Sequence, residues 1–507
     1  MLGAVLPALL AGCTVGPSDR PAVLARDGGP QQNTTTPREE APLPPLGEQS
    51  GDMVPWTGCD KRTRQALDAP QRRDAGAMRY SCATIPSTLD TPQLPDRGVI
   101  RISVLKAESG SGGSKIPLLV VNDIDGEPGT VFAARLAARL PNELLDRFAI
   151  IGVDRRGTGG SNPISCVPRK ARSDLLGFDP AAPDIDPLVT AARDAGQECA
   201  LILKNMQGAL DTWRTAGDLD EIRRRLGAPF LHVLARGEGS RVVQSYAQRF
   251  TDKLGRVVLD GVPDPSEQAE TVLEGQAAGA EAALDAFAGD CRTRNCPLGD
   301  DPRATVSRLL DRLRHGDRGL APGAATRAIL TGLGEPDRWP ALAKATDAAL
   351  HGDVRPLDEF LGPQDTDNPY PSVLDATLAT TCNDTRTRLA PQHIAELSAD
   401  WRQKYPVFGG LLAQRLVWCS QWPVRREPVA NPAMRGAPPV LVVSTAADPR
   451  TPALGTMRAA QQMPSSVRIG WEGAGHGAVG RSDCVTEQIM TFLADGAVPS
   501  QGVTCPP

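Results

Sequence analysis

Residues Phe230 to Ser245 read FLHVLARGEGSRVVQS, and the organisation of the chain can be worked out from this stretch. The first five residues form an apolar run typical of a buried strand, and the residues after Gly239 have the spacing of an amphipathic helix. The turn between them, 235–239, contains two glycines that permit a sharp bend. A strand–turn–helix unit of this kind can present a nucleophilic serine at the tip of the turn. Position 237 is glycine, so the attacking atom is missing.

Short apolar runs recur on both sides of this stretch and alternate with helical patterns such as 218–226. Continuous apolar runs are typical of parallel strands that are buried on both faces. They occur at 117–122, 148–153, 230–234, 256–259, 438–443 and 467–471. The run 99–105 alternates instead, which indicates an early antiparallel strand. We therefore predict an α/β fold with a mostly parallel sheet and helices on both faces.

The strand signal disappears between residues 264 and 423. Alanine, leucine, arginine and aspartate recur there at helical spacing, as in Ala304 to Leu313 and Trp339 to Ala349. We interpret 264–423 as a helical lid inserted between two parts of the core, 51–263 and 424–507. Such a lid would cover the crevice at the carboxyl ends of the strands, where ligands bind in open α/β sheets.

Composition narrows the classes of partner. The 507 residues are 40% hydrophobic, enough for a large core, and carry a formal net charge of -5. There is no strongly basic footprint, so we do not expect nucleic acid as a partner. The composition does not indicate an oligomeric state.

The N-terminus predicts export. Residues 1–12 are mostly apolar and end in Leu10-Ala-Gly-Cys13, which matches a bacterial lipobox. We predict a signal segment over 1–12, lipid attachment at Cys13, and a disordered tether over 13–50 that is rich in proline, glycine and threonine. The apolar run is too short to span a bilayer, and its lack of a basic region leaves open a start upstream of Met1. The chain would be anchored on the outer face of a bacterial cell membrane or, with an ordinary signal peptide, secreted.

Cysteine usage agrees with an oxidising compartment. Without Cys13, ten of the 11 cysteines remain, an even set that suits disulfides. None has CxxC metal-ligand spacing, and we predict no metal and no cofactor. Connectivity cannot be deduced from sequence, but pairing of neighbours gives Cys59–Cys82, Cys166–Cys199, Cys291–Cys296, Cys382–Cys419 and Cys484–Cys505.

An acid and a histidine follow the glycine turn in the order that a catalytic triad needs. Asp448 comes after the predicted strand 438–444, and His476 lies in a glycine turn after the strand 467–471. Together they could orient and activate a nucleophile. His232 lies in the strand before the turn and is interpreted as a core residue. The three remaining histidines lie in charged helical surroundings.

Several separated motifs resemble the secreted bacterial tripeptidyl aminopeptidases, α/β-hydrolases related to proline iminopeptidases. The resemblance extends from about Trp56 to Cys505. Its motifs are Gly152-Val-Asp-Arg-Arg-Gly-Thr-Gly-Gly-Ser161, Thr215 to Leu226, Val258-Leu-Asp-Gly-Val-Pro-Asp-Pro265, Thr381-Cys-Asn-Asp384, Asp448-Pro-Arg-Thr-Pro452, and Gly473 to Gly480 before Cys484. The resemblance implies an α/β-hydrolase fold and an exopeptidase-type site beneath a helical cap.

Two departures from this family bear on chemistry. The resemblance implies that Gly237 stands at the position of the nucleophilic serine. It also implies a glycine-rich oxyanion loop after the first buried strand, but residues 122–129 read NDIDGEPG and bring in three acids. Of this region, Asp123, Gly126 and the backbone N–H of Glu238 are the candidates for lining the oxyanion site. Carboxylates there would oppose a developing oxyanion rather than stabilise it.

Other chemistries remain open from the sequence. Ser240, one helical turn beyond Gly237, is an alternative nucleophile, and Glu238 could help His476 to position an attacking water. The Gly237-Glu-Gly239 turn with Asp260 after the next strand also partly matches a dinucleotide-binding motif, but position 242 is valine instead of the third glycine.

We predict a catalytically impaired or inactive member of this family that holds a peptide or small acyl-type ligand between sheet and lid. The alternative is a working peptidase or esterase that uses an activated water or Ser240. A scaffold without a small ligand is a third possibility. Glycine at position 237 would also relieve the strain that a residue with a Cβ suffers in such a turn.

Overall fold

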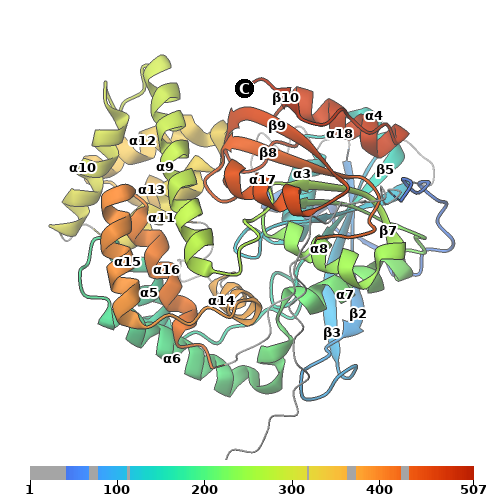
Figure 1. Ribbon diagram of the computed structural model, residues 1–507, viewed down its shortest axis with the longest axis horizontal. Helices are drawn as coiled ribbons and strands as arrows, with labels where there is room; N and C mark the ends of the chain where they lie inside the picture. The colour runs from blue at the N-terminus through green and yellow to red at the C-terminus, as the bar shows by residue number, and fades with distance from the viewer. Residues whose placement is uncertain (1–40, 68–77, 111–114, 317–318, 362–372, 424–432) are drawn as a thin grey trace, which may run out of the picture. The chain divides into compact units, whose positions relative to one another are not determined.

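The computed structural model describes residues 41–67, 78–110, 115–316, 319–361, 373–423 and 433–507 (Figure 1). The predicted signal segment, Cys13 and most of the predicted tether lie outside these residues. Within the described residues, no helix is both long and apolar enough to cross a membrane.

One sheet organises the core, and ten strands belong to it in the described part of the chain. They are β1 Thr57–Gly58, β2 Met78–Thr88, β3 Val99–Ser109, β4 Ile116–Val121, β5 Phe148–Val153, β6 Leu231–Arg236, β7 Leu254–Asp260, β8 Val440–Ala447, β9 Ser466–Ala474 and β10 Val503–Cys505. The spatial order is β1-β2-β3-β5-β4-β6-β7-β8-β9-β10.

The sheet is mostly parallel, as the apolar runs predict. Strands β5, β4, β6, β7, β8, β9 and β10 pair in parallel, whereas β1, β2 and β3 form an antiparallel extension that joins β5. The alternating run at 99–105 predicts β3, whereas β2 and the short strands β1 and β10 were not predicted. Strand β2 pairs with β3 along its whole length and contains Pro86 and several small polar residues, so its apolar alternation is weak.

Helices cover both faces of the sheet, because side chains along each parallel strand alternate between two apolar cores. In β4, Leu119 and Val121 belong to one core and Leu118 and Val120 to the other. The first core contains side chains of α7 (Thr212–Arg225), α8 (Gly239–Arg249) and α17 (Ala453–Gln462). The second contains side chains of α3 (Gly129–Ala137), α4 (Asn142–Arg147) and α18 (Asp483–Asp495).

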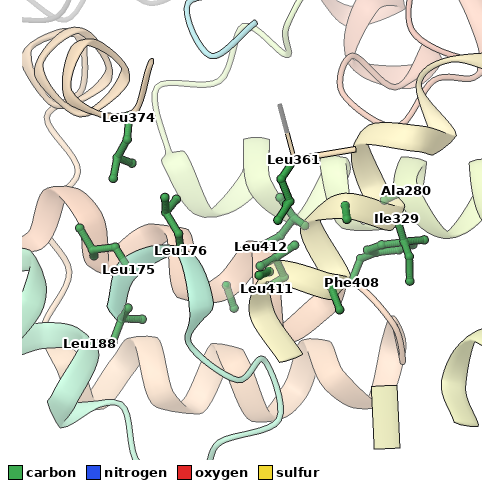
Figure 2. Close-up of a cluster of buried hydrophobic side chains, with 14 of the residues drawn as sticks. Leu175, Leu176, Leu188, Ala280, Ile329, Leu361, Leu374, Phe408, Leu411 and Leu412 are labelled. Atoms are coloured by element: carbon green, nitrogen blue, oxygen red, sulfur yellow. The ribbon is translucent and has the colours of Figure 1, made fainter. Parts of the chain in front are cut away.

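A third apolar core belongs to the helices that follow β7 and precede β8. These are α9 Ala269–Thr293, α10 Pro302–Arg314, α11 Pro322–Leu333, α12 Trp339–Leu350, α13 Arg355–Asp358, α14 Val373–Asp384, α15 Pro391–Lys404 and α16 Gly409–Ser420. Figure 1 shows them gathered beside the sheet, and Figure 2 shows part of their leucine-rich core. Two earlier helices, α5 (Arg169–Gly177) and α6 (Asp186–Leu203), share this core. The helical cap therefore draws on two separate parts of the sequence and is not confined to 264–423, the range predicted for it.

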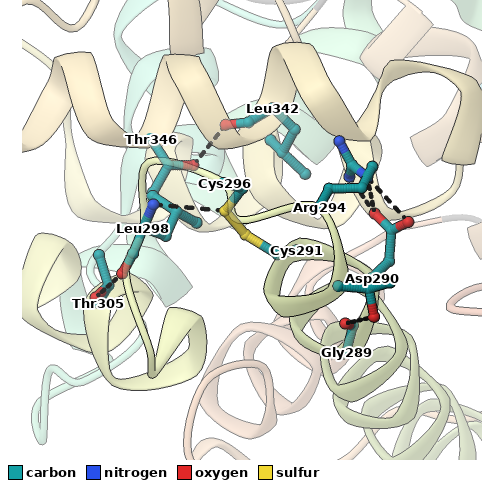
Figure 3. The surroundings of a disulfide bond; sticks show 10 residues. Gly289, Asp290, Cys291, Arg294, Cys296, Leu298, Thr305, Leu342 and Thr346 are labelled. Carbon is teal, nitrogen blue, oxygen red and sulfur yellow. Dashed lines mark hydrogen bonds and ion pairs between the residues drawn. A yellow bond between two sulfur atoms is a disulfide. The ribbon is translucent and has the colours of Figure 1, made fainter.

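Five disulfides join neighbouring cysteines along the chain in the described residues: Cys59–Cys82, Cys166–Cys199, Cys291–Cys296, Cys382–Cys419 and Cys484–Cys505. Three of them lie in the cap. Cys291–Cys296 closes the turn after α9, where the N–H of Leu298 faces the sulfur of Cys296 (Figure 3).

The folded part begins earlier than the predicted boundary at residue 50. The carbonyl of Leu46 accepts a hydrogen bond from Nε2 of His232 at 2.9 Å, since Nδ1 of the ring accepts from the N–H of Arg256. The N–H of Ser50 bonds to the carbonyl of Gly227, and Leu43 and Leu46 pack against the second apolar core. The apolar residues in this proline-rich stretch are few and irregularly spaced, so the sequence pattern did not reveal the contact.

Candidate functional site

The turn after β6 has a backbone that suits glycine. Gly237 has φ of 57°, in the left-handed region that residues with a Cβ rarely adopt. A Cβ at position 237 would lie 2.0 Å from Oδ1 of Asp123. Gly239, the first residue of α8, is also required, since a Cβ there would lie 2.4 Å from the carbonyl oxygen of Val121. The turn therefore keeps the shape predicted for a nucleophile-bearing bend, while its tip has no side chain.

Asp448 and His476 meet at the carboxyl edge of the sheet, as their order in the sequence suggested. Nδ1 of His476 lies 3.1 Å from each carboxylate oxygen of Asp448. The same carboxylate accepts the backbone N–H groups of Arg450 and Thr451 and the hydroxyl of Thr451, at 2.8 to 2.9 Å. These donors fix the carboxylate in the orientation that holds the imidazole ring.

The loop that carries His476 is fixed from two sides. From the sheet, the buried carboxylate of Asp260 at the end of β7 accepts the N–H groups of Ala478 and Val479 at 2.9 to 3.1 Å. From the cap, the carbonyl of Gly334 accepts the N–H of His476 at 2.9 Å. Because Asp260 is used in this way, it does not serve the partial dinucleotide motif considered above.

The space at the tip of the turn is filled by Asp123, from the loop after β4. Its Oδ2 lies 2.8 Å from Nε2 of His476, the ring nitrogen that would face a serine hydroxyl. Its Oδ1 accepts the N–H of Glu238 at 2.8 Å, a donor that would otherwise be available to an oxyanion. The Asp123 carboxylate thus occupies two contacts that a serine hydrolase needs: that of the nucleophile with His476 and that of the oxyanion with the N–H of Glu238.

Electrostatics favour a charged histidine in this arrangement. Burial by itself lowers the pKa of His476, but the carboxylates of Asp448 and Asp123 outweigh it and raise the pKa to about 9. Burial would raise the pKa values of Asp123 and Asp448, but the charge of His476 holds both below their ordinary value. The imidazolium donates from both ring nitrogens, so it has no free lone pair with which to take a proton.

The rest of the predicted oxyanion region does not supply replacement donors to the tip of the turn. The N–H of Gly126 bonds to the carbonyl of Asp123 at 3.3 Å, within the loop itself. The carboxylate of Asp125 pairs with Arg450 at 2.8 Å, and that of Glu127 pairs with Arg135 at 3.0 Å. The three acids of this loop therefore have separate ion-pair partners, and only Asp123 reaches the histidine.

The alternative nucleophile, Ser240, is placed away from the site. Its side chain is fully buried, and its hydroxyl donates to the carbonyl of Gly261 at 2.8 Å. His232 is a core residue, as expected: Nδ1 accepts the N–H of Arg256, and burial lowers the pKa of the ring to about 4. The structure therefore brings Asp448, His476, Gly237, Glu238 and Asp123 together and leaves Ser240 outside this group.

A cavity of about 290 Å³ lies between the turn and the cap. Asp123, Asp125, Glu238 and Arg155 line it near the sheet. Leucines of the cap line much of the remainder, together with polar and charged residues such as Gln414 and Arg415. Of the described triad residues, neither His476 nor Asp448 lines this cavity. Asp123 thus lies between the histidine and the cavity.

Arg155 is a buried lining residue that was not among the site residues predicted from the sequence. It lies in the Asp154-Arg-Arg-Gly157 motif, whose next residue, Arg156, forms a buried ion pair with Asp218 at 2.7 Å. The signal available in the sequence was a pair of arginines just after a buried strand. The surroundings of Arg155 could not be foreseen, because Thr212, Asp384 and Glu238 come from remote segments.

The comparisons with known proteins agree with this architecture. Residues 126–348 match the family described as alpha/beta hydrolase fold, and residues 405–505 match the TAP-like protein family. Carboxylesterase B of Mycobacterium tuberculosis is 30% identical over 462 residues, which cover 84% of this chain and 86% of the relative. Serine protease Hip1 of the same organism is 27% identical, covering 90% and 91%. Tripeptidyl aminopeptidase of Streptomyces lividans is 26% identical, covering 80% of each chain.

The relatives span nearly the whole folded part of the chain, and their names all denote hydrolases. Together with the parallel sheet, the glycine turn after β6 and the following acid and histidine, they identify the family. The chain belongs to the α/β-hydrolase family, within its tripeptidyl aminopeptidase-like group.

Proposed function

We propose that this protein is a ligand-binding α/β-hydrolase-fold protein that does not hydrolyse what it binds. The ligand is a peptide or another small acyl-type molecule held in the cavity between sheet and cap. The observation that carries the proposal is the position of Asp123. Its carboxylate fills the space in front of Gly237 and is bonded to both His476 and the N–H of Glu238.

The magnitudes argue against residual serine-type catalysis. Removing the nucleophile of a serine protease lowers kcat by about 10⁶-fold, and losing one oxyanion donor lowers it by about 10²- to 10³-fold. Here Gly237 stands in place of the nucleophile. The N–H of Glu238, which would be the oxyanion donor, is instead bonded to Asp123. A carboxylate at this point also repels the negative charge that develops during acyl transfer.

The water mechanism meets a different obstacle. A water molecule is activated by a neutral imidazole with a free nitrogen, but both nitrogens of His476 face carboxylates. The raised pKa keeps the ring protonated at neutral pH. Hydrolysis by this route would first require Asp123 to move away from the ring.

We further propose that the protein is exported and attached to the outer face of the cell membrane through a lipid on Cys13. The lipobox-like sequence at residues 10–13 supports this proposal. The five disulfides also support it, because disulfides persist in oxidising compartments. Radiolabelled palmitate incorporation tests it: we expect the label in the wild-type protein and its loss in Cys13→Ala.

A fluorophosphonate probe tests the catalytic proposal, because it labels activated serines. Four proteins are compared: the wild type, Gly237→Ser, Gly237→Ser with Asp123→Gly, and the double variant with His476→Ala added. The single change is not sufficient, since a Cβ at position 237 would lie 2.0 Å from Asp123. We expect labelling of the double variant, and its loss when His476 is replaced.

Labelling of the wild type, or its hydrolysis of fluorogenic tripeptides with a dependence on His476, would overturn the proposal. If the double variant is not labelled although it melts as cooperatively as the wild type, a vacated serine site is the wrong account of this turn. Each outcome concerns chemistry at the turn and does not depend on which ligand occupies the cavity.

A further inference from the structure

The cavity has two chemically different parts. Its cap side is lined largely by leucines from α5, α6, α14 and α16, which Figure 2 shows within one apolar cluster. A few polar and charged cap residues, among them Arg327, Gln414 and Arg415, also line this side. The leucines include Leu175, Leu176, Leu188, Leu374, Leu411 and Leu412. Its sheet side is lined by charged residues of the loops after β4, β5 and β6. A ligand that fills both parts must be apolar along one end and polar at the other.

The charges on the sheet side differ in how well they are paired. Asp123 is bonded to His476, and Asp125 is bonded to Arg450. Arg155 is different: it is only 3% exposed, and its Nε and Nη1 have no hydrogen-bond partner in the described part of the chain. Its Nη2 makes one long contact of 3.4 Å with the hydroxyl of Thr212. A buried cation that lacks acceptors is costly unless something else supplies them.

The carboxylates around Arg155 compensate its charge only in part. Burial lowers the pKa of Arg155, and the opposing effects of Asp384 and then Glu238 do not restore it. Burial, followed by the neighbouring charge of Asp211, raises the pKa of Asp384 to about 7. Asp384 is therefore partly protonated near neutral pH and is a weak counter-ion.

We propose that the ligand carries a carboxylate on an aliphatic or apolar chain, with the carboxylate at Arg155 and the chain among the leucines of the cap. This rests on the non-hydrolytic function proposed above, because a peptide ligand is retained only if its amide bonds are not cleaved. A carboxylate supplies two acceptors in the planar geometry that a guanidinium prefers. A fatty acid and the C-terminus of a short apolar peptide share this chemistry.

Calorimetric titration of the full chain tests the proposal with two ligand series. Hexanoate, octanoate and decanoate test the apolar part: each buried methylene should strengthen binding by about fourfold. Decanoate, decanol and decylammonium test the polar part, and decanoate should bind at least about tenfold more tightly than decanol. N-acetyl-trileucine and its C-terminal amide repeat, with a peptide, the comparison of a carboxylate with a neutral group. Tighter binding of decanoate or of N-acetyl-trileucine then shows whether the ligand is a fatty acid or a peptide.

Variants locate the two parts of the site. Arg155→Gln should weaken decanoate by about tenfold or more and leave decanol unchanged. Arg241→Gln is the control, because this other lining arginine already has partners: it donates to the carbonyl of Asp264 at 3.2 Å and pairs with Glu238 at 3.6 Å. Leu411→Trp should fill the apolar part and remove the dependence on chain length. Melting curves show whether each variant folds, and the wild-type series carry the test if one does not.

Equal or tighter binding of decanol or decylammonium would overturn the proposal, as would affinity that does not change with chain length. An effect of Arg241→Gln as large as that of Arg155→Gln would also contradict it. Fluorophosphonate labelling of the wild type would instead refute the proposed function, so the two failures can be told apart.

Discussion

Replacing Asp123 by asparagine should lower the pKa of His476. Asparagine has nearly the same shape, and its amide can still accept from the N–H of Glu238 while donating to a neutral Nε2 of the histidine. The negative charge is lost, and one carboxylate within hydrogen-bond distance typically shifts the pKa of its partner by about 1–3 units. We expect the titration of His476 to move down from about 9 by this amount.

The same change alters how stability depends on pH. The folded-state pKa of His476 is raised above its ordinary value of 6.5. Its protonation therefore stabilises the fold fully below pH 6.5, and this contribution is lost as the pH rises through about 9. At 1.36 kcal/mol per pKa unit, the difference corresponds to about 3 kcal/mol of unfolding free energy. In the asparagine variant, about 1.4 kcal/mol or more of the loss between pH 6.5 and 9 should disappear, since the pKa falls by at least about one unit.

Two measurements check this reasoning. Proton NMR follows the imidazole signals with pH, which is practical because the chain has only five histidines and His476→Gln assigns the relevant one. Urea unfolding at pH 6.5 and pH 9 gives the change in free energy. Asp125→Asn is the matched control, because Asp125 lies in the same loop as Asp123 but pairs with Arg450 instead of His476. A wild-type His476 that titrates near 6.5, or one that does not respond to the loss of Asp123, would refute the reasoning.

Three further changes test the framework around the site. Gly237→Ser alone should lower the unfolding free energy by about 1–3 kcal/mol in urea melts, because φ is positive and a Cβ meets the neighbouring carboxylate; unchanged stability would contradict the geometry of the turn. Replacing both Cys382 and Cys419 by serine should cost about 2–4 kcal/mol, because their bridge spans 37 residues and joins α14 to α16; an unaltered denaturation midpoint would argue against the bridge. Asp218→Asn should cost about 3–5 kcal/mol in thermal or urea unfolding because it leaves Arg156 buried and unpaired, and a loss below 1 kcal/mol would show that the pair is solvated.

The strands of the parallel sheet could be predicted from the sequence, because short apolar runs and nearby turn residues determine them. Continuous apolar runs such as 148–153 became β5 with the same bounds, since a strand that is apolar on both sides can be buried only between two layers of helices. The turn at Gly237 was readable for the same reason: a strand, two nearby glycines and an amphipathic helix restrict the chain to one sharp bend. The meeting of Asp448 with His476 followed from their places after successive parallel strands. Strand β2 was missed because its apolar alternation is weak.

Only the tertiary structure showed what occupies the vacant nucleophile position. The sequence showed an acid at position 123 and a glycine at 237, but these positions belong to different loops. A displacement of a few ångströms would separate the carboxylate from Nε2 of His476 and the N–H of Glu238. The same holds for Arg155, whose missing acceptors depend on how the cap packs over the sheet. Sequence patterns report which faces are buried, because burial follows local periodicity, whereas hydrogen bonds and charge pairing depend on distances between remote segments that only packing fixes.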